Sequence, residues 1–142
     1  MLSIRHTGIY VKDLTAMKDF YCSCFGMQIV SEGIENGSYI ENLLGNPELS
    51  INVCKLRFPD GTMLELIEPD RDGDKDAHSS NVINCGCVHI AFTVKDLQIL
   101  YNKLAKLGIT FISQPMLSPD GKVYVCFCQD PEGNYLELVQ EL

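Results

Sequence analysis

The 142-residue chain contains an internal repeat, which limits its possible folds more than any other feature. His6–Leu14 matches His89–Leu97 at five of nine positions, with an offset of 83 residues. Asn52–Glu68 matches Tyr124–Gln140 at seven of seventeen positions, with an offset of 72 residues. Because the order, the turn residues and several polar residues match, the chain is predicted to consist of two related modules.

Each copy predicts the same order of elements. An alternating, β-branched stretch, Ser3–Val11 in the first copy, predicts a strand. A helical stripe follows, capped by Asp13 and ended by Gly26, with Asp96 and Gly108 in the second copy. The next elements are strands and tight hairpin turns, predicted at Met27–Gly33, Ile109–Ser113, Phe58–Gly61 and Asp130–Asn134. The fold class is therefore α+β, with two βαβββ modules and about eight strands.

The modules are assigned to residues 1–68 and 87–142, joined by a linker at 69–86. Within the linker, the aspartates at every second position from Asp70 to Asp76 superficially resemble a calcium loop. Lys75 and Asn81 stand where such a loop needs Gly and Glu, so a solvated acidic linker is favoured. Ser38–Gly45 is predicted to be a short helix or a lid over a pocket.

Composition excludes several classes of function. The net charge of −8 and the lack of a basic cluster argue against nucleic-acid binding. No apolar run is long enough to span a membrane, and the polar start of the chain argues against a signal peptide, so a cytoplasmic location is expected. The seven Cys are then read as free thiols, and the three Cys-x-Cys pairs as buried and inert. Ligation by Cys85 and Cys87 stays an alternative if the strand of His89 begins early.

Strand alternation places one His or one Glu on the face of each of four strands opposite the apolar face that the helices cover. These residues are His6 and Glu65 in the first copy and His89 and Glu137 in the second. Two neutral imidazoles and two carboxylates suit a divalent ion such as Zn, Ni, Co, Mn or Fe(II). Two carboxylates facing an apolar cavity also need a cation. The third histidine, His78, lies in the polar linker and needs no role.

With these motifs, the sequence resembles the vicinal oxygen chelate superfamily, which includes glyoxalase I, methylmalonyl-CoA epimerases, extradiol dioxygenases and antibiotic-resistance proteins. The resemblance covers nearly the whole chain. It rests on four groups of motifs: His6–Val11 with Asp13-Leu14, Phe20-Tyr21 and Phe25-Gly26; Leu64–Leu66; His89–Phe92; and Asp130–Asn134 with Leu136–Leu138. The resemblance implies a cup-shaped, eight-stranded half-barrel with the helices outside, one metal ion and a homodimer.

The glyoxalase I branch of this superfamily carries the same order of ligands, with Glu65 where epimerases usually have Gln. The implied activity is that of a metal-dependent lyase or isomerase acting on a small oxygenated substrate through a metal-bound enediolate. Glu65 and Glu137 are the implied bases. Tyr10 and Pro69 stand where glyoxalase I has the Arg and Asn expected to serve glutathione.

Three alternatives are kept. An epimerase of the methylmalonyl-CoA type would use the same proton chemistry. A non-catalytic, drug-binding protein of the same fold would usually lack the metal ligands. An extradiol dioxygenase needs only two His and one carboxylate on iron.

Overall fold

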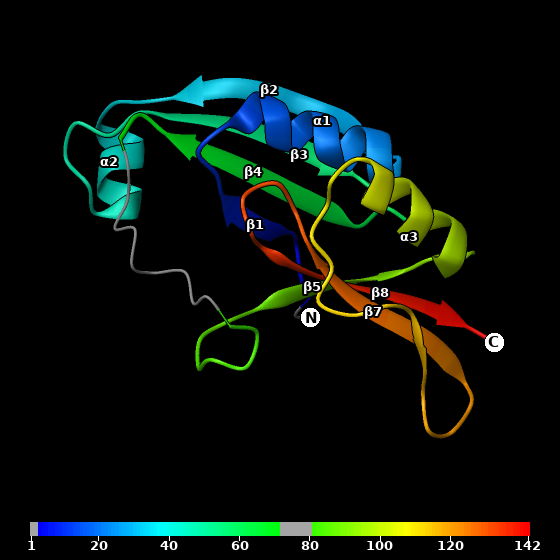
Figure 1. The fold of residues 1–142 in the computed structure, drawn as a ribbon. Helices are drawn as coiled ribbons and strands as arrows, with labels where there is room; N and C mark the ends of the chain where they lie inside the picture. Colours follow the sequence, from blue (N-terminus) through cyan, green and yellow to red (C-terminus); the bar gives the residue numbers. More distant parts are fainter. Residues whose placement is uncertain (1–2, 72–80) are drawn as a thin grey trace. The chain divides into compact units, whose positions relative to one another are not determined.

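The structure, a computed structural model, describes residues 3–71 and 81–142. His78 and the acidic run from position 72 onward lie outside the described residues. The chain divides into two compact units, Met1–Lys75 and Asp76–Leu142. Figure 1 shows their elements in chain order.

The first unit is a four-stranded sheet with two helices. Its strand order is β1-β4-β3-β2, with β1 and β4 parallel and the other pairs antiparallel. The elements are β1 (Thr7–Tyr10), α1 (Leu14–Phe25), β2 (Gln28–Glu35), α2 (Ser38–Leu44), β3 (Ile51–Arg57) and β4 (Met63–Pro69).

The second unit repeats this arrangement without the counterpart of α2. Its strand order is β5-β8-β7-β6, again with one parallel pair, between β5 and β8. The elements are β5 (His89–Thr93), α3 (Leu97–Lys106), β6 (Met116–Leu117), β7 (Val123–Gln129) and β8 (Tyr135–Glu141). Two repeated α+β modules are thus confirmed, while the cup formed by both stays a prediction.

The long helix of each unit begins where the sequence predicts. The Asp13 side chain accepts a hydrogen bond from the Ala16 backbone N–H, and Gly26 ends α1 in the left-handed conformation. Asp96 caps α3 in the same way. A second anchor was not predicted: the Glu68 side chain accepts from the Leu14 N–H at 3.0 Å. Gln140, its counterpart in the repeat, accepts from the first N–H of α3 at 2.7 Å.

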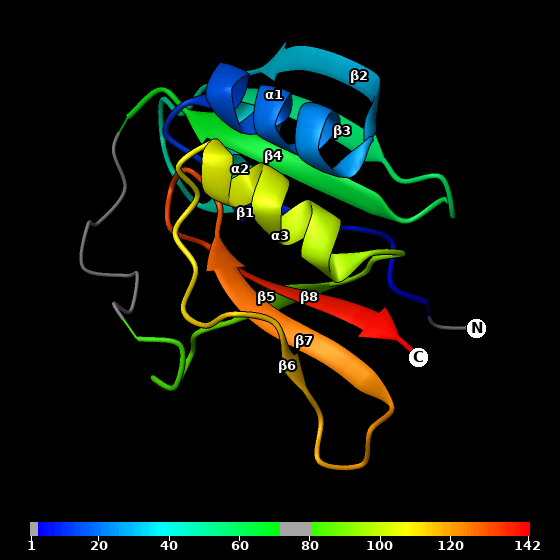
Figure 2. The ribbon, with the colours of Figure 1, turned by 45° about the vertical axis from the view of Figure 1, so that its right-hand side comes forward.

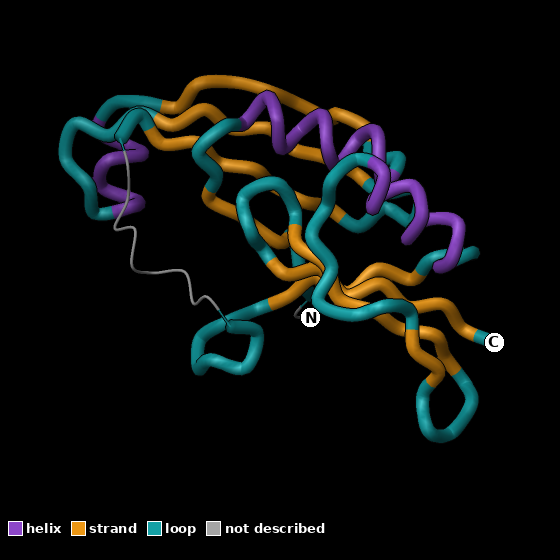
Figure 3. The backbone as a smooth tube through the Cα atoms, viewed as in Figure 1, coloured by secondary structure: helices purple, strands orange, loops and turns teal. Residues whose placement is uncertain are grey.

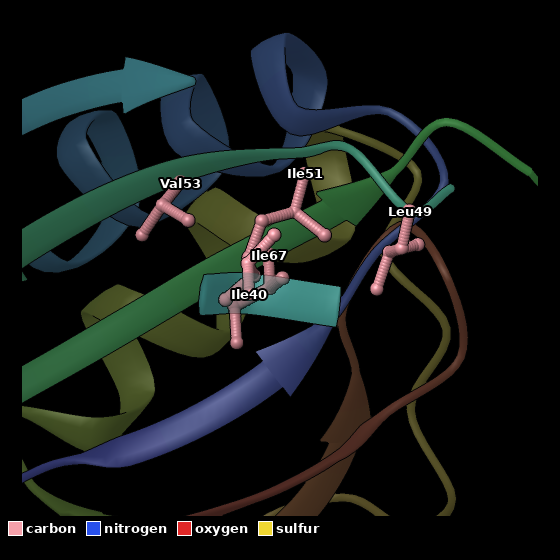
Figure 4. Packing of buried hydrophobic residues seen from close by; sticks show 5 residues of the cluster. All are labelled: Ile40, Leu49, Ile51, Val53 and Ile67. Carbon is pink, nitrogen blue, oxygen red and sulfur yellow. The ribbon is translucent and has the colours of Figure 1, made fainter. Parts of the chain in front are cut away.

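The two faces of the first sheet differ in what covers them. Leu64 and Leu66 are almost fully buried on the face that carries α1, which packs on β3 and β4 (Figure 2). The short helix α2 was predicted as a helix or a lid. Its Ile40 packs with β3 and β4 residues that alternate with those leucines (Figure 4). The cluster consists of Ile40, Leu49, Ile51, Val53 and Ile67.

Three strand predictions need correction. The first strand is shorter than Ser3–Val11, so His6 lies just before β1. Ile109–Ser113 is not a strand: it makes one isolated bridge, between Phe111 and Cys128, and the segment is drawn as loop in Figure 3. Pro115, which has no N–H to donate, separates this bridge from β6. Finally, β5 begins only at His89, so Cys85 and Cys87 are not in its register.

Candidate metal centre

The first unit brings His6 and Glu65 together. In the parallel β1–β4 pair, Gly8 is the register partner of Glu65, and His6 lies two residues earlier on the same face. The imidazole Nε2 lies 3.2 Å from the carboxylate Oε2. The side chains are 35% and 16% exposed, so a ligand can reach both.

The second unit reproduces this contact. Ala91 is the register partner of Glu137 in the parallel β5–β8 pair, and His89 again lies two residues earlier. His89 Nε2 lies 3.1 Å from Glu137 Oε2, with side chains 43% and 25% exposed. Each unit therefore presents the same His–Glu pair, at the equivalent position of its own sheet.

Each pair has the chemistry and spacing of two neighbouring ligands of a metal ion. Ligands about 2.1 Å from a first-row ion lie about 3.0–3.4 Å apart, for angles from square to tetrahedral. The observed separations of 3.1 and 3.2 Å fall in this range. Among residues 3–71 and 81–142, no group of three or more such side chains converges. A single centre formed by all four residues therefore stays a prediction.

A lysine beside Glu65 was missed by the sequence analysis. Lys55 is the cross-strand partner of Glu65 in the β3–β4 hairpin, and its Nζ lies 3.4 Å from Glu65 Oε1. The turn around Asp60 could have revealed it, because Lys55 and Glu65 lie equally far from that residue. The counterpart of Lys55 in the repeat is Phe127, the cross-strand partner of Glu137.

Phe127 gives the second pair an apolar neighbour. Its ring packs edge-on against the His89 imidazole, with the ring centroids 5.2 Å apart. The two pairs are thus alike in their His and Glu but differ in the third side chain. In the first unit that side chain is a cation, and in the second it is an aromatic ring.

Two cavities of the first unit meet at His6, Lys55 and Glu65. The larger, about 560 Å³, is lined by α2 and has both apolar walls, such as Ile40 and Ile67, and polar ones. Tyr10 and Tyr39 contribute exposed rings to it. The smaller, about 220 Å³, extends toward Arg5 and Arg57. The first His–Glu pair is therefore accessible from both cavities.

The cysteines match the prediction only in part. Cys54, Cys126 and Cys128 are buried, and burial raises the pKa of Cys54 and of Cys126 to about 11. These two thiols stay protonated at neutral pH and are poor nucleophiles. The other thiols are not buried, and Cys85 is exposed. All seven are free.

Comparison with known proteins finds one matching family model and several relatives of similar length. The family model described as Glyoxalase/Bleomycin resistance protein/Dioxygenase superfamily matches residues 3–138. The uncharacterized protein YwbC of Bacillus subtilis is 30% identical over 141 residues, covering 96% of both chains. A lactoylglutathione lyase of Pseudomonas aeruginosa is 28% identical over 145 residues, covering 96% of this chain and 81% of the lyase.

Solved structures agree on the fold. A glyoxalase family protein from Bacillus cereus has a TM-score of 0.91 at 20% identity, covering 100% of this chain and 95% of the other. The trypanothione-dependent glyoxalase I of Leishmania major has a TM-score of 0.65 at 22% identity, covering 99% and 88%. In the described part of the chain, no helix is long and apolar enough to cross a membrane. The family model spans nearly the whole chain, and the chain belongs to the Glyoxalase/Bleomycin resistance protein/Dioxygenase superfamily.

Proposed function

We propose that this protein is a divalent-metal-dependent lyase or isomerase of the glyoxalase I type, acting on a small oxygenated molecule. The observation that carries the proposal is the His–Glu contact present in both units, between His6 and Glu65 and between His89 and Glu137. Two unrelated surface contacts would not be expected at repeat-matched positions. The lactoylglutathione lyases among the relatives support the same class of reaction.

In this proposal the four side chains share two tasks. When bound, a divalent ion would draw charge from two neighbouring substrate oxygens and so acidify the adjacent C–H. The two imidazoles would hold the ion through a ring nitrogen, which must be unprotonated to donate to a metal. Glu65 and Glu137 are the groups able to accept the substrate proton and return it, since each is a carboxylate open to a ligand. Because they come from different modules, they can serve opposite faces of one carbon, as an isomerase requires.

The proposal is tested by measuring metal content and turnover on the same preparations. We expect Glu65→Gln and Glu137→Gln to keep much of the metal, because Gln retains an oxygen donor of similar size. Turnover should fall by roughly 10²–10⁴, the usual contribution of a general base. His6→Ala and His89→Ala should mainly lose metal, because a nitrogen ligand is removed.

Glu141→Gln is the matched control, since Glu141 is an exposed carboxylate on the same strand as Glu137. The screen uses the hemithioacetal of methylglyoxal with glutathione and epimers of acyl-CoA thioesters, each with several metals. Full turnover with full metal in both Gln variants would exclude these carboxylates as the base. Wild-type protein that retains no added metal would refute the proposed function.

One contact favours a second candidate, a binding protein without catalysis. Lys55 already provides Glu65 with a cation at 3.4 Å, which a carboxylate reserved for a metal does not need. If this candidate is correct, the protein binds small molecules equally well with and without added metal. Binding that requires added metal would favour the metal-dependent enzyme over the non-catalytic binding protein.

The substrate need not contain glutathione. Tyr10, where glyoxalase I has Arg, is 53% exposed and lines the larger cavity. Pro69, where that enzyme has Asn, is the last residue of β4. Neither side chain carries a positive charge that could form an ion pair with a glutathione carboxylate, so the residues that line the cavities are the better guide to the substrate.

A further inference from the structure

The smaller cavity of the first unit has a charge opposite to that of the whole protein. The chain has a net charge of −8 and only three arginines, yet two of them, Arg5 and Arg57, line this cavity with Lys55. Within the described part of the chain, Glu65 is the only carboxylate that lines this cavity. The cavity therefore has an excess of positive charge beside the His6–Glu65 pair.

Strand geometry explains why two of these cations lie together. Lys55 and Arg57 are two residues apart on β3, so they share the face that also carries Glu65 of β4. Arg57 donates a weak hydrogen bond from Nε to the Met63 sulfur at 3.5 Å. Within residues 3–71 and 81–142, neither Arg5 nor Arg57 has an ion-pair partner, so both guanidinium groups are available to a ligand.

The repeat shows that the fold does not require these cations. Arg5, Lys55 and Arg57 correspond in the second unit to Val88, Phe127 and Gln129. The backbone register is the same, because Lys55 faces Glu65 as Phe127 faces Glu137. The second unit forms the same sheet and the same His–Glu contact with none of the three charges. The positive charge of this cavity is thus specific to the first unit, and binding of an anionic ligand would explain it.

We propose that this cavity binds an anionic group of the substrate, a carboxylate or a phosphate, and that the substrate is a small organic acid with an apolar body. Arginine is suited to both anions, because its planar guanidinium donates two parallel hydrogen bonds. The apolar body would occupy the larger cavity, which shares His6, Lys55 and Glu65 with the smaller one. This inference rests on the proposed function for the reaction at the His–Glu pairs, but not for anion binding itself.

The test is calorimetric titration of the full chain with three probes: phenylacetate, phenyl phosphate and the neutral phenylacetamide. Each is measured on metal-free protein and on protein loaded with Mn²⁺. We expect at least one of the two acids to bind more tightly than the amide in both forms. Arg57→Gln should lower the affinity for that acid by roughly tenfold to a hundredfold, which is the usual effect of losing a hydrogen bond to a charged group. The affinity for the amide should not change.

Two further variants make the result interpretable. Lys122→Gln removes the same charge from an exposed site of the second unit and should bind all probes as the wild type does. Arg5→Gln should act in the same direction as Arg57→Gln. Relative affinities of the two acids show whether the site prefers carboxylate or phosphate.

The anion site is refuted if neither acid binds more tightly than the amide, or if the double variant of Arg5 and Arg57 binds that acid as the wild type does. Failure of this inference is distinct from failure of the proposed function. If the protein binds Mn²⁺ but the arginine variants bind the acids as the wild type does, only the anion site is refuted. If acid binding depends on the arginines but the protein binds no metal, only the proposed metal-dependent reaction is refuted.

Discussion

Replacing Lys55 should strengthen metal binding, and this effect tests whether Glu65 is a ligand. In the structure, Lys55 Nζ lies 3.4 Å from Glu65 Oε1. A metal ion that takes the carboxylate must displace this ion pair and tolerate the nearby ammonium. Lys55→Met keeps a side chain of similar length and removes the charge, so both penalties disappear.

The size of the effect follows from the distance and the exposure. Two unit charges at about 3.4 Å interact by about 1 kcal/mol in water and about 5 kcal/mol at an effective dielectric constant near 20. Because the Lys55 side chain is 39% exposed, the lower value applies. About 1 kcal/mol corresponds to a gain of roughly fivefold in metal affinity. Repulsion between the ammonium and the ion acts in the same direction.

The assay is calorimetric titration with Mn²⁺, which prefers oxygen and nitrogen donors and is a poor match for the free cysteines. Lys122→Met is the control, since Lys122 forms an exposed pair with Asp120 in the second unit. The reciprocal change, Phe127→Lys, should weaken Mn²⁺ binding by placing a cation beside Glu137. Unchanged or weaker affinity in Lys55→Met, with an unchanged control, would show that Glu65 is not a ligand.

Four other predictions concern stability and assembly. In the folded protein the pKa of Cys54 and of Cys126 is about 11, above the ordinary thiol value of 9.0. The two protonated thiols therefore contribute fully to the free energy of unfolding below pH 9, and this contribution is lost as the pH rises through 11. Urea unfolding should therefore show a loss of at most about 3 kcal/mol per thiol over this range, and a flatter profile in the double Ala variant. Leu66→Ala, at a fully buried site, should cost about 2–5 kcal/mol in the same assay, and a cost below 1 kcal/mol would contradict the packing. Glu68→Ala should cost about 1–3 kcal/mol, because it removes the acceptor for the Leu14 N–H, and an unchanged midpoint would rule out this anchor. Sedimentation should give a homodimer, whereas a 15.9 kDa species alone would contradict it.

The sequence was most informative where a residue's environment depends on its neighbours along the chain. Alternation correctly separated buried Leu64 and Leu66 from Glu65, because successive strand residues point to opposite faces. The caps at Asp13 and Asp96 were correct for the same reason, since a cap bonds within its own first turn.

Contacts between distant segments were harder to predict. The bond from Glu68 to the start of α1 joins residues 54 positions apart, and no local pattern signals it. The edge segment Ile109–Ser113 has a strand-like composition, but it pairs with β7 only through the bridge between Phe111 and Cys128. Pro115 has no N–H to donate, and regular pairing with β7 begins only at Met116. Lys55 was different, because the hairpin turn fixes its partner and the register could have been counted.

The differences between the two modules carry as much functional meaning as their similarity. A repeated His–Glu pair is best explained by one task that needs both copies, and metal ligation is such a task, because an ion gains from every added donor. A cation that appears in only one copy cannot serve that shared task. Placed 3.4 Å from Glu65, Lys55 would oppose metal binding by this carboxylate, and such a cost would be explained if the ammonium serves another partner. In our proposal an acidic substrate would be that partner: a metal that took the carboxylate would leave the Lys55 ammonium beside Arg5 and Arg57, which have no ion-pair partner within residues 3–71 and 81–142.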